Sequence, residues 1–176
     1  IHHGIPIDDF TFNPDGGDGL LFFGRIHPDK GAKEAIVVAQ AAKRSLDLYG
    51  IVQDEGYYER EIVPSVDGDA IRYHGAVGGE ARREALGSAQ ALLHLINFDE
   101  PFGLSVIEAM ASGTPVIATN RGSMPELIEH GVNGFLVDDI HGALRAIDRL
   151  DEIDRAQVRK TVADRFSIER MADAYI

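Results

Sequence analysis

The chain has 176 residues, of which 44% are hydrophobic and 26% charged, so it is long enough for one well-buried domain and too short for two large ones. Its formal net charge of −12 argues against a nucleic-acid partner, and no apolar run approaches the roughly 20 residues that a membrane-spanning helix needs. The absence of cysteine excludes disulfides and thiolate metal sites and permits a reducing cytoplasm, which is the expected location.

Residues 1–19 are rich in Gly, Pro and Asp and show no sustained periodicity, which predicts a linker. After the linker, short apolar runs alternate with segments of helical periodicity. The expected strands are residues 20–23, 46–52, 71–74, 91–96, 116–118 and 135–137. The expected helices are residues 32–44, 57–62, 78–87, the segments between the later strands, and much of 142–176, where Ser167 would cap a final helix.

This alternation predicts βαβ units and therefore an α/β fold: a Rossmann-like, doubly wound parallel sheet of about six strands with helices on both faces. In such sheets, ligands bind beyond the carboxyl ends of the strands, at a topological switch point. The functional residues are therefore expected in the loops that follow strands, at residues 25–30, 53–56, 75–79, 97–102 and 120–124.

Residues 99–113 carry the most informative pattern, a loop that runs into a short helix after a buried strand. Pro101 suits the first turn of a helix, because its missing N–H would have no intrahelical partner there. A helix that starts at this point would direct free backbone N–H groups outward, with the positive end of the helix dipole behind them. The sequence therefore predicts an anion site formed by Phe102, Gly103 and Leu104.

Two carboxylates frame the predicted anion site, Glu100 just before the helix and Glu108 about one turn inside it. Acids beside a phosphate would repel it, so we interpret them as hydrogen-bond acceptors for hydroxyl groups of the same ligand. A sugar attached to a nucleotide offers both kinds of group. The alternative is an ordinary proline-started helix with one exposed and one half-buried glutamate.

The loop after the first strand, residues 24–31, contains Arg25 and Lys30 on either side of a tight turn. Both side chains are suited to one phosphate near the strand end, Arg as a planar fork and Lys as a point charge. The alternative is that they are two solvated surface cations. The loop lacks the Gly-x-Gly-x-x-Gly spacing of dinucleotide-binding folds and the Gly-Lys-Ser/Thr of a Walker loop, which excludes both motifs.

The histidines at 27, 74, 94, 130 and 141 lack the i, i+4 spacing of a helical metal pair, so most of them are expected to be structural or surface residues.

Residues 100–116, EPFGLSVIEAMASGTPV, closely resemble the Glu-x7-Glu signature of retaining glycosyltransferases of family 4, which have the GT-B fold. The resemblance extends over essentially the whole chain, through residues 3–10, 24–31, 73–77, 122–128 and 131–137. It implies that the chain is one half of a GT-B fold. The implied division is an interdomain linker (1–19), a nucleotide-sugar-binding domain (20–165), and a C-terminal helix (166–176) that packs toward the N-terminal domain.

By this resemblance Arg25, Lys30 and Glu100 are the catalytic residues of a hexosyltransferase, with Glu100 on the transferred sugar and the two cations on the donor diphosphate. The donor is a nucleoside-diphosphate sugar, with UDP or GDP as the nucleotide, and neither a metal nor another cofactor is implied. Glu108 would bind the ribose hydroxyls. The other implied donor-binding residues are Gly24, His74, Gly75, Val77, Phe102, Gly103 and Leu104.

The resemblance also implies that the acceptor binds to an N-terminal domain, the second partner of this chain, which the sequence does not contain. The chain alone is then expected to bind a nucleotide sugar weakly and to transfer little. Self-association through the uncovered apolar face is a further expectation, and contact with a membrane surface is expected only through the N-terminal domain. Two alternatives stay open: a nucleotide-sugar-binding module without transfer activity, and a purely structural α/β domain.

Overall fold

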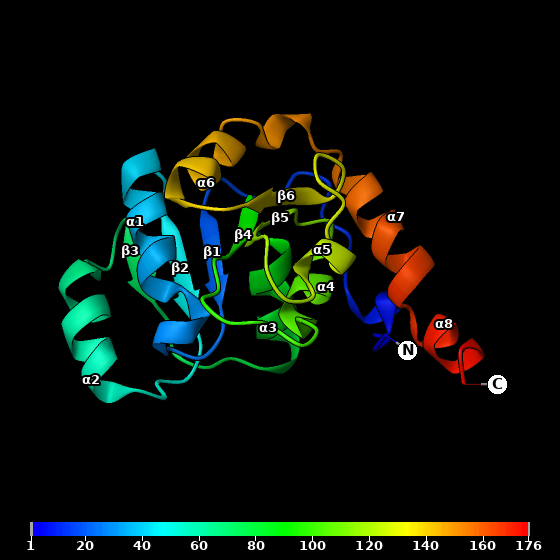
Figure 1. Cartoon of the computed structure of the whole chain (residues 1–176), viewed down its shortest axis with the longest axis horizontal. Helices are drawn as coiled ribbons and strands as arrows, with labels where there is room; N and C mark the ends of the chain where they lie inside the picture. Colours follow the sequence, from blue (N-terminus) through cyan, green and yellow to red (C-terminus); the bar gives the residue numbers. More distant parts are fainter. Residues whose placement is uncertain (1, 176) are drawn as a thin grey trace.

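The computed structural model describes residues 2–175, so Ile1 and Ile176, the outer ends of the expected linker and C-terminal helix, lie outside the described residues. Six strands form one parallel sheet in the order β3-β2-β1-β4-β5-β6 (Figure 1). This order reverses direction between β1 and β4, as in doubly wound nucleotide-binding folds, and it confirms the predicted fold class. The strands are β1 (Leu20–Phe23), β2 (Leu46–Tyr49), β3 (Ile71–Tyr73), β4 (Ala91–His94), β5 (Val116–Thr119) and β6 (Gly134–Val137).

Helices cover both faces of the sheet, as the fully buried strands β1 and β4 require. Helices α1 (Ala32–Ala42) and α6 (Ile140–Ile147) pack against each other on one face. On the other face, α3 (Gly79–Gly87) packs against α4 (Leu104–Ala111), and α7 (Arg155–Phe166) packs against α4. The shorter helices are α2 (Glu55–Tyr57), α5 (Met124–Leu127) and α8 (Ile168–Asp173), with 3₁₀ or π turns at Ile7–Asp9, Pro28–Lys30, Tyr58–Ile62, Val63–Ser65 and Leu150–Glu152.

Several elements end earlier than their sequence patterns predict. Helix α1 stops at Ala42 because Lys43 takes a left-handed conformation (φ 55°). Strand β2 stops at Tyr49, and the next N–H, that of Gly50, bonds to the Gly75 carbonyl (2.9 Å) beyond the end of β3. Strand β3 ends at residue 73 and β4 at residue 94, one and two residues short of expectation.

Across residues 2–175, no helix is both long and apolar enough to cross a membrane.

The N-terminal segment is packed against the end of the domain. Ile5 and Phe10 are buried, and the Ile5 N–H bonds to the Phe166 carbonyl (2.9 Å), so the first described residues lie beside α8 (Figure 1). Arg155 on α7 donates to the carbonyls of residues 13, 87 and 89, and burial lowers its pKa to about 10. Arg159 donates to the Phe10 carbonyl (2.6 Å). These bonds hold the predicted linker in one position on the domain.

Candidate functional site

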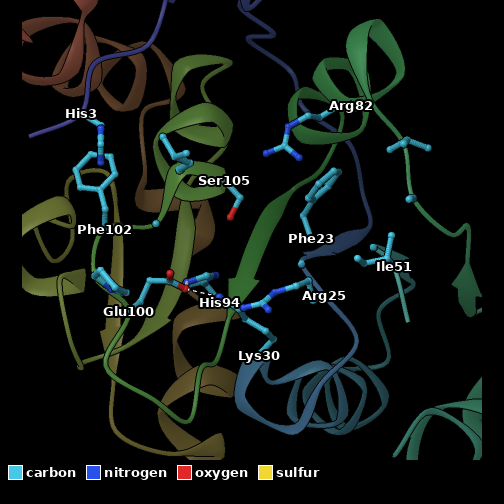
Figure 2. Close-up of a pocket in the computed structure, with 17 residues that line it drawn as sticks. His3, Phe23, Arg25, Lys30, Ile51, Arg82, His94, Glu100, Phe102 and Ser105 are labelled. Atoms are coloured by element: carbon cyan, nitrogen blue, oxygen red, sulfur yellow. Dashed lines mark hydrogen bonds and ion pairs between the residues drawn. The ribbon is translucent and has the colours of Figure 1, made fainter. Parts of the chain in front are cut away.

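A cleft of about 490 Å³ opens at the carboxyl end of the sheet, beside the switch point between β1 and β4 (Figure 2). Eight sequence-predicted site residues line it: Gly24, Arg25, Lys30, Val77, Glu100, Phe102, Gly103 and Leu104. Three predicted residues, His74, Gly75 and Glu108, are not among its lining residues. The remaining lining residues are His3, Phe23, Gly50, Ile51, Ala76, Arg82, His94, Pro101 and Ser105.

The centre of the cleft is an ion pair between Lys30 and Glu100, which come from the loops after β1 and β4. The Lys30 Nζ lies 2.7 Å from the Glu100 Oε2, and the two side chains are only 14% and 15% exposed. Lys30 also lies over the ring of Phe98, 4.4 Å from its centroid. An ammonium has three N–H donors, so Lys30 can keep this bond and still donate to a ligand.

Glu100 is held in its ionised form. The pKa of Glu100 is lowered from 4.5 to about 2 by His94 and Lys30, against the opposing effect of burial. The His94 Nε2 is 3.7 Å from the Glu100 Oε2, which is longer than a hydrogen bond, so the direct 2.7 Å bond from Lys30 is the stronger of the two contacts in this conformation. Glu100 is therefore a carboxylate at neutral pH and can only accept hydrogen bonds.

Arg25 adds a second cation to the same side of the cleft and points toward Lys30 and Glu100 (Figure 2). Its Nη1 donates to the Gln53 Oε1 (2.8 Å), so the loop after β2 orients the guanidinium. Lys30 is paired with Glu100 and Arg82 with Glu108. Arg25 has no acidic partner among the described residues, although the whole chain carries a net charge of −12. This local excess of positive charge favours an anionic ligand.

Helix α4 starts later than the sequence pattern predicts, so the expectation that Pro101 occupies its first turn is wrong. Gly103 takes a left-handed conformation (φ 97°) and forms the N-cap, which leaves Pro101 and Phe102 in the loop before the helix. In the described chain, the N–H groups of Leu104 and Ser105 have no backbone hydrogen-bond partner. Both residues line the cleft, so the free N–H groups of the helix start still face the site.

Glu108 lies in the second turn of α4, just behind the cleft. Its Oε2 accepts hydrogen bonds from the Nε (3.0 Å) and Nη2 of Arg82, a residue of α3. The guanidinium of Arg82 also lies over the ring of Phe23, 4.4 Å from its centroid. The side chains are 17% exposed for Glu108 and 30% exposed for Arg82. Arg82 therefore connects the cleft wall to the second glutamate of the motif.

His74 and Gly75 lie beyond the cleft, at the end of the edge strand β3. The His74 Nε2 is 2.6 Å from the Asp47 Oδ1, and its ring stacks on Tyr49. Burial alone would raise the pKa of Asp47, but hydrogen bonds from Arg72 and His74 outweigh it and lower the pKa. Of the predicted segment after β3, only Val77 and its neighbour Ala76 reach the cleft.

The sequence prediction did not include Phe23, His94 and Arg82 among the residues that line the cleft. Phe23 and His94 are the last residues of β1 and β4, so the rule that ligands bind at carboxyl strand ends could have identified them. Arg82 reaches the site only because α3 packs against α4, and no local pattern indicates this. Within residues 2–175, no group of three or more acidic or histidine side chains is arranged to hold a metal ion.

Comparison with known proteins identifies the family. Residues 17–152 match the sequence profile of the family described as glycosyl transferases group 1. The chain belongs to this family. The match covers the sheet and the entire cleft except His3, so the site described above lies within the family domain.

The curated relatives that resemble this chain are longer than it is. The chain is 29% identical over 184 residues to the D-inositol 3-phosphate glycosyltransferase of Streptomyces griseus, covering 78% of the chain and 37% of that protein. It is 35% identical over 131 residues to the GDP-mannose-dependent alpha-mannosyltransferase of Corynebacterium glutamicum, covering 73% of the chain and 30% of that protein. The chain thus spans about a third of the length of these relatives.

Solved structures of glycosyltransferases have the same fold. A glycosyltransferase involved in avilamycin A biosynthesis superposes with a TM-score of 0.82 at 29% identity, over 98% of this chain and 54% of that one. The C-terminal domain of a glycosyl transferase group 1 protein from Francisella tularensis superposes with a TM-score of 0.77 at 21% identity, over 94% of this chain and 100% of that one. The chain therefore has the C-terminal domain fold of a GT-B glycosyltransferase.

Proposed function

We propose that this chain is the donor-binding domain of a retaining glycosyltransferase, which transfers a hexose from a nucleoside-diphosphate sugar. The observation that carries the proposal is the meeting of Arg25, Lys30 and Glu100 in one cleft at the switch point of the sheet. Cations and an ionised carboxylate side by side suit a ligand that has both phosphates and hydroxyl groups. A nucleotide sugar is such a ligand.

The diphosphate is proposed to lie between Arg25, Lys30 and the start of α4. Arg25 and Lys30 supply full positive charges, and the free N–H groups of Leu104 and Ser105 supply hydrogen bonds at the positive end of the helix dipole. As the bond to the sugar breaks, negative charge grows on the departing diphosphate, and these groups stabilise it. On this proposal the protein's own cations suffice, and no metal takes part.

The sugar and the nucleoside are proposed to lie on either side of the diphosphate. Glu100 accepts hydrogen bonds from hydroxyls of the sugar. Glu108 accepts from the ribose through its Oε1, because both bonds from Arg82 go to its Oε2. The base lies against Ile51, Ala76 and Val77 at the far end of the cleft. An Anabaena protein with this fold was solved in complex with UDP-glucose, and the Corynebacterium relative is named for GDP-mannose, so both nucleotides are candidates.

The acceptor is proposed to bind to a further domain, because the chain spans 54% of the avilamycin glycosyltransferase chain. Phe102 at the cleft contacts Phe166 at the end of α7, with ring centroids 6.0 Å apart. The exposed apolar side chains of Leu104 and Ile168 on this side would be covered by that domain, or by a second copy of the chain in its absence. The proposed location is the cytoplasm, which the absence of cysteine permits.

The test is isothermal calorimetry of the chain with UDP, GDP, UDP-glucose and GDP-mannose, with free glucose as the control ligand. We expect saturable binding of one nucleoside diphosphate and its sugar, and no binding of glucose alone. An absence of binding by all four nucleotides at millimolar concentration would contradict the proposal and leave a structural domain. Transfer to an acceptor is expected only when the N-terminal domain is supplied, and efficient turnover by these 176 residues alone would contradict that part.

A further inference from the structure

His94 contributes a buried nitrogen to the cleft that has no partner in the described chain. It is the last residue of β4 and is only 6% exposed. Its Nε2 is buried and makes no hydrogen bond to any described residue. Buried polar atoms in folded proteins are rarely left without a hydrogen bond, so an unbonded one at the wall of a cleft indicates a group that bonds to a ligand.

The carboxylate of Glu100 lies close to this nitrogen. The His94 Nε2 lies 3.7 Å from the Glu100 Oε2, too far for a direct bond, and both groups face the same part of the cleft (Figure 2). Lys30 occupies the Oε2, and the second oxygen of Glu100 has no hydrogen bond to any described residue. Because a lone pair facing a carboxylate would be repelled, we assign the ring proton of His94 to Nε2, which makes this nitrogen a donor.

A donor and an acceptor at this spacing suit a hydroxyl group, which accepts one hydrogen bond and donates another. A phosphate suits them poorly, since it can only accept and Glu100 would repel it. We propose that His94 and Glu100 form a donor–acceptor pair that binds the hydroxyl groups of the transferred sugar, with His94 donating. This inference rests on the proposed function and assigns His94 to the sugar, not to the nucleotide.

The test compares the sugar's contribution to affinity in the wild-type chain and in His94→Phe, which keeps a planar ring but loses the N–H. Calorimetry is run with the nucleoside diphosphate that binds and with its sugar conjugate, UDP with UDP-glucose or GDP with GDP-mannose. We expect His94→Phe to weaken binding of the conjugate by about tenfold, the usual effect of losing one hydrogen bond, and to leave the free diphosphate within about twofold. His94→Gln, which keeps an N–H donor, is expected to recover part of the loss.

His141→Phe is the matched control, because His141 is an exposed residue of α6 that does not line the cleft. Equal losses for the diphosphate and its conjugate would overturn the assignment, since they would mean that His94 only supports the cleft. An unchanged affinity for the conjugate would overturn it as well. Failure of the wild-type chain to bind any nucleotide would instead overturn the proposed function, and the assignment with it.

A measurement on the wild-type chain avoids the case in which the variants fail to fold. Long-range ¹H–¹⁵N spectra of the histidine rings are recorded with the diphosphate and then with the conjugate. The His94 Nε2 signal is expected to shift when the sugar is present and to stay in place with the diphosphate alone. Identical spectra with the two ligands would overturn the assignment.

Discussion

Arg82 and Glu108 form an ion pair between α3 and α4, directly behind the proposed nucleotide site. Both bonds from the guanidinium go to the Oε2 of Glu108, which leaves the Oε1 available to a ligand. The same guanidinium stacks on Phe23, whose ring lines the cleft. Arg82 therefore orients the second glutamate of the Glu-x7-Glu motif and also completes the wall.

A double-mutant cycle of Arg82→Ala and Glu108→Gln measures how much the interaction between these two residues contributes to stability. We expect a coupling free energy of about 1–2 kcal/mol in urea unfolding, above that of an exposed pair, because both side chains are largely buried. Arg83→Ala is the control, because Arg83 is the neighbouring residue and lies outside the cleft. It should change the free energy of unfolding little. Additive effects of the two substitutions would show that the pair contributes nothing to stability.

Lys30→Ala is expected to weaken binding of the nucleoside diphosphate by roughly 1.5–3 kcal/mol, the typical value of a hydrogen bond to a charged group. The substitution removes a positive charge and also leaves Glu100 unneutralised beside the phosphates. Lys33→Ala is the matched control, since Lys33 pairs with Glu61 away from the cleft. If calorimetry gives the same affinity for the nucleoside diphosphate in both variants, Lys30 does not bind the diphosphate.

The stability of the domain should depend on the ionisation of Glu100. Its pKa is lowered from 4.5 to about 2 in the folded state, so the ionised carboxylate stabilises the fold above pH 4.5 and this contribution is lost as the pH falls from 4.5 toward 2. We expect the free energy of unfolding of the wild type to exceed that of Glu100→Gln at pH 7. The difference should shrink below pH 4.5, and a difference that stays constant down to pH 2.5 would refute this interpretation.

Gly103→Ala should destabilise the domain and weaken nucleotide binding together. Alanine is unfavourable at φ 97°, and its Cβ would lie 2.8 Å from the Cε of the buried Met124. Gly131→Ala is the matched control, because Gly131 has a similar φ of 82° but open space around it. We expect Gly131→Ala to lower the free energy of unfolding by about 1 kcal/mol, and Gly103→Ala to lower it by about 2–3 kcal/mol, as measured by thermal unfolding. Equal losses would show that the contact with Met124 is relieved at no cost.

The strands and the principal charges of the site could be predicted from the sequence because they follow from local rules. A buried parallel strand is a short apolar run, and β1 begins and ends where its run does. Ligands bind at the carboxyl ends of parallel strands, and this rule alone is enough to place Arg25, Lys30 and Glu100 at one edge of the sheet. The observed order of the strands, which places β1 beside β4, is what brings the loops of Lys30 and Glu100 together.

Other features depend on contacts between residues that are far apart in the sequence, and local sequence patterns do not predict such contacts. Pro101 and Gly103 both suit a helix start, and the left-handed backbone of Gly103 decides between them. His74 lies away from the cleft because the register of β2 and β3 places Asp47 within its reach. Arg82 reaches Glu108 only through the packing of α3 on α4, so its role could not be read from residues near it in the chain.

The switch point also determines when the cleft can form during folding. Strands β1, β2 and β3 come from residues 20–73, and β4, β5 and β6 from residues 91–137, so each half of the sheet is built from its own part of the chain. Within the sheet, the pairing of Leu20 with Ala91 and of Leu21 with Leu92 joins the halves, and α1 packs on α6 across the same boundary. Lys30 and Glu100, 70 residues apart, meet only after this long-range step. If a nucleotide binds as proposed, it stabilises the fully joined sheet and neither half before it, so binding would report on the completion of folding.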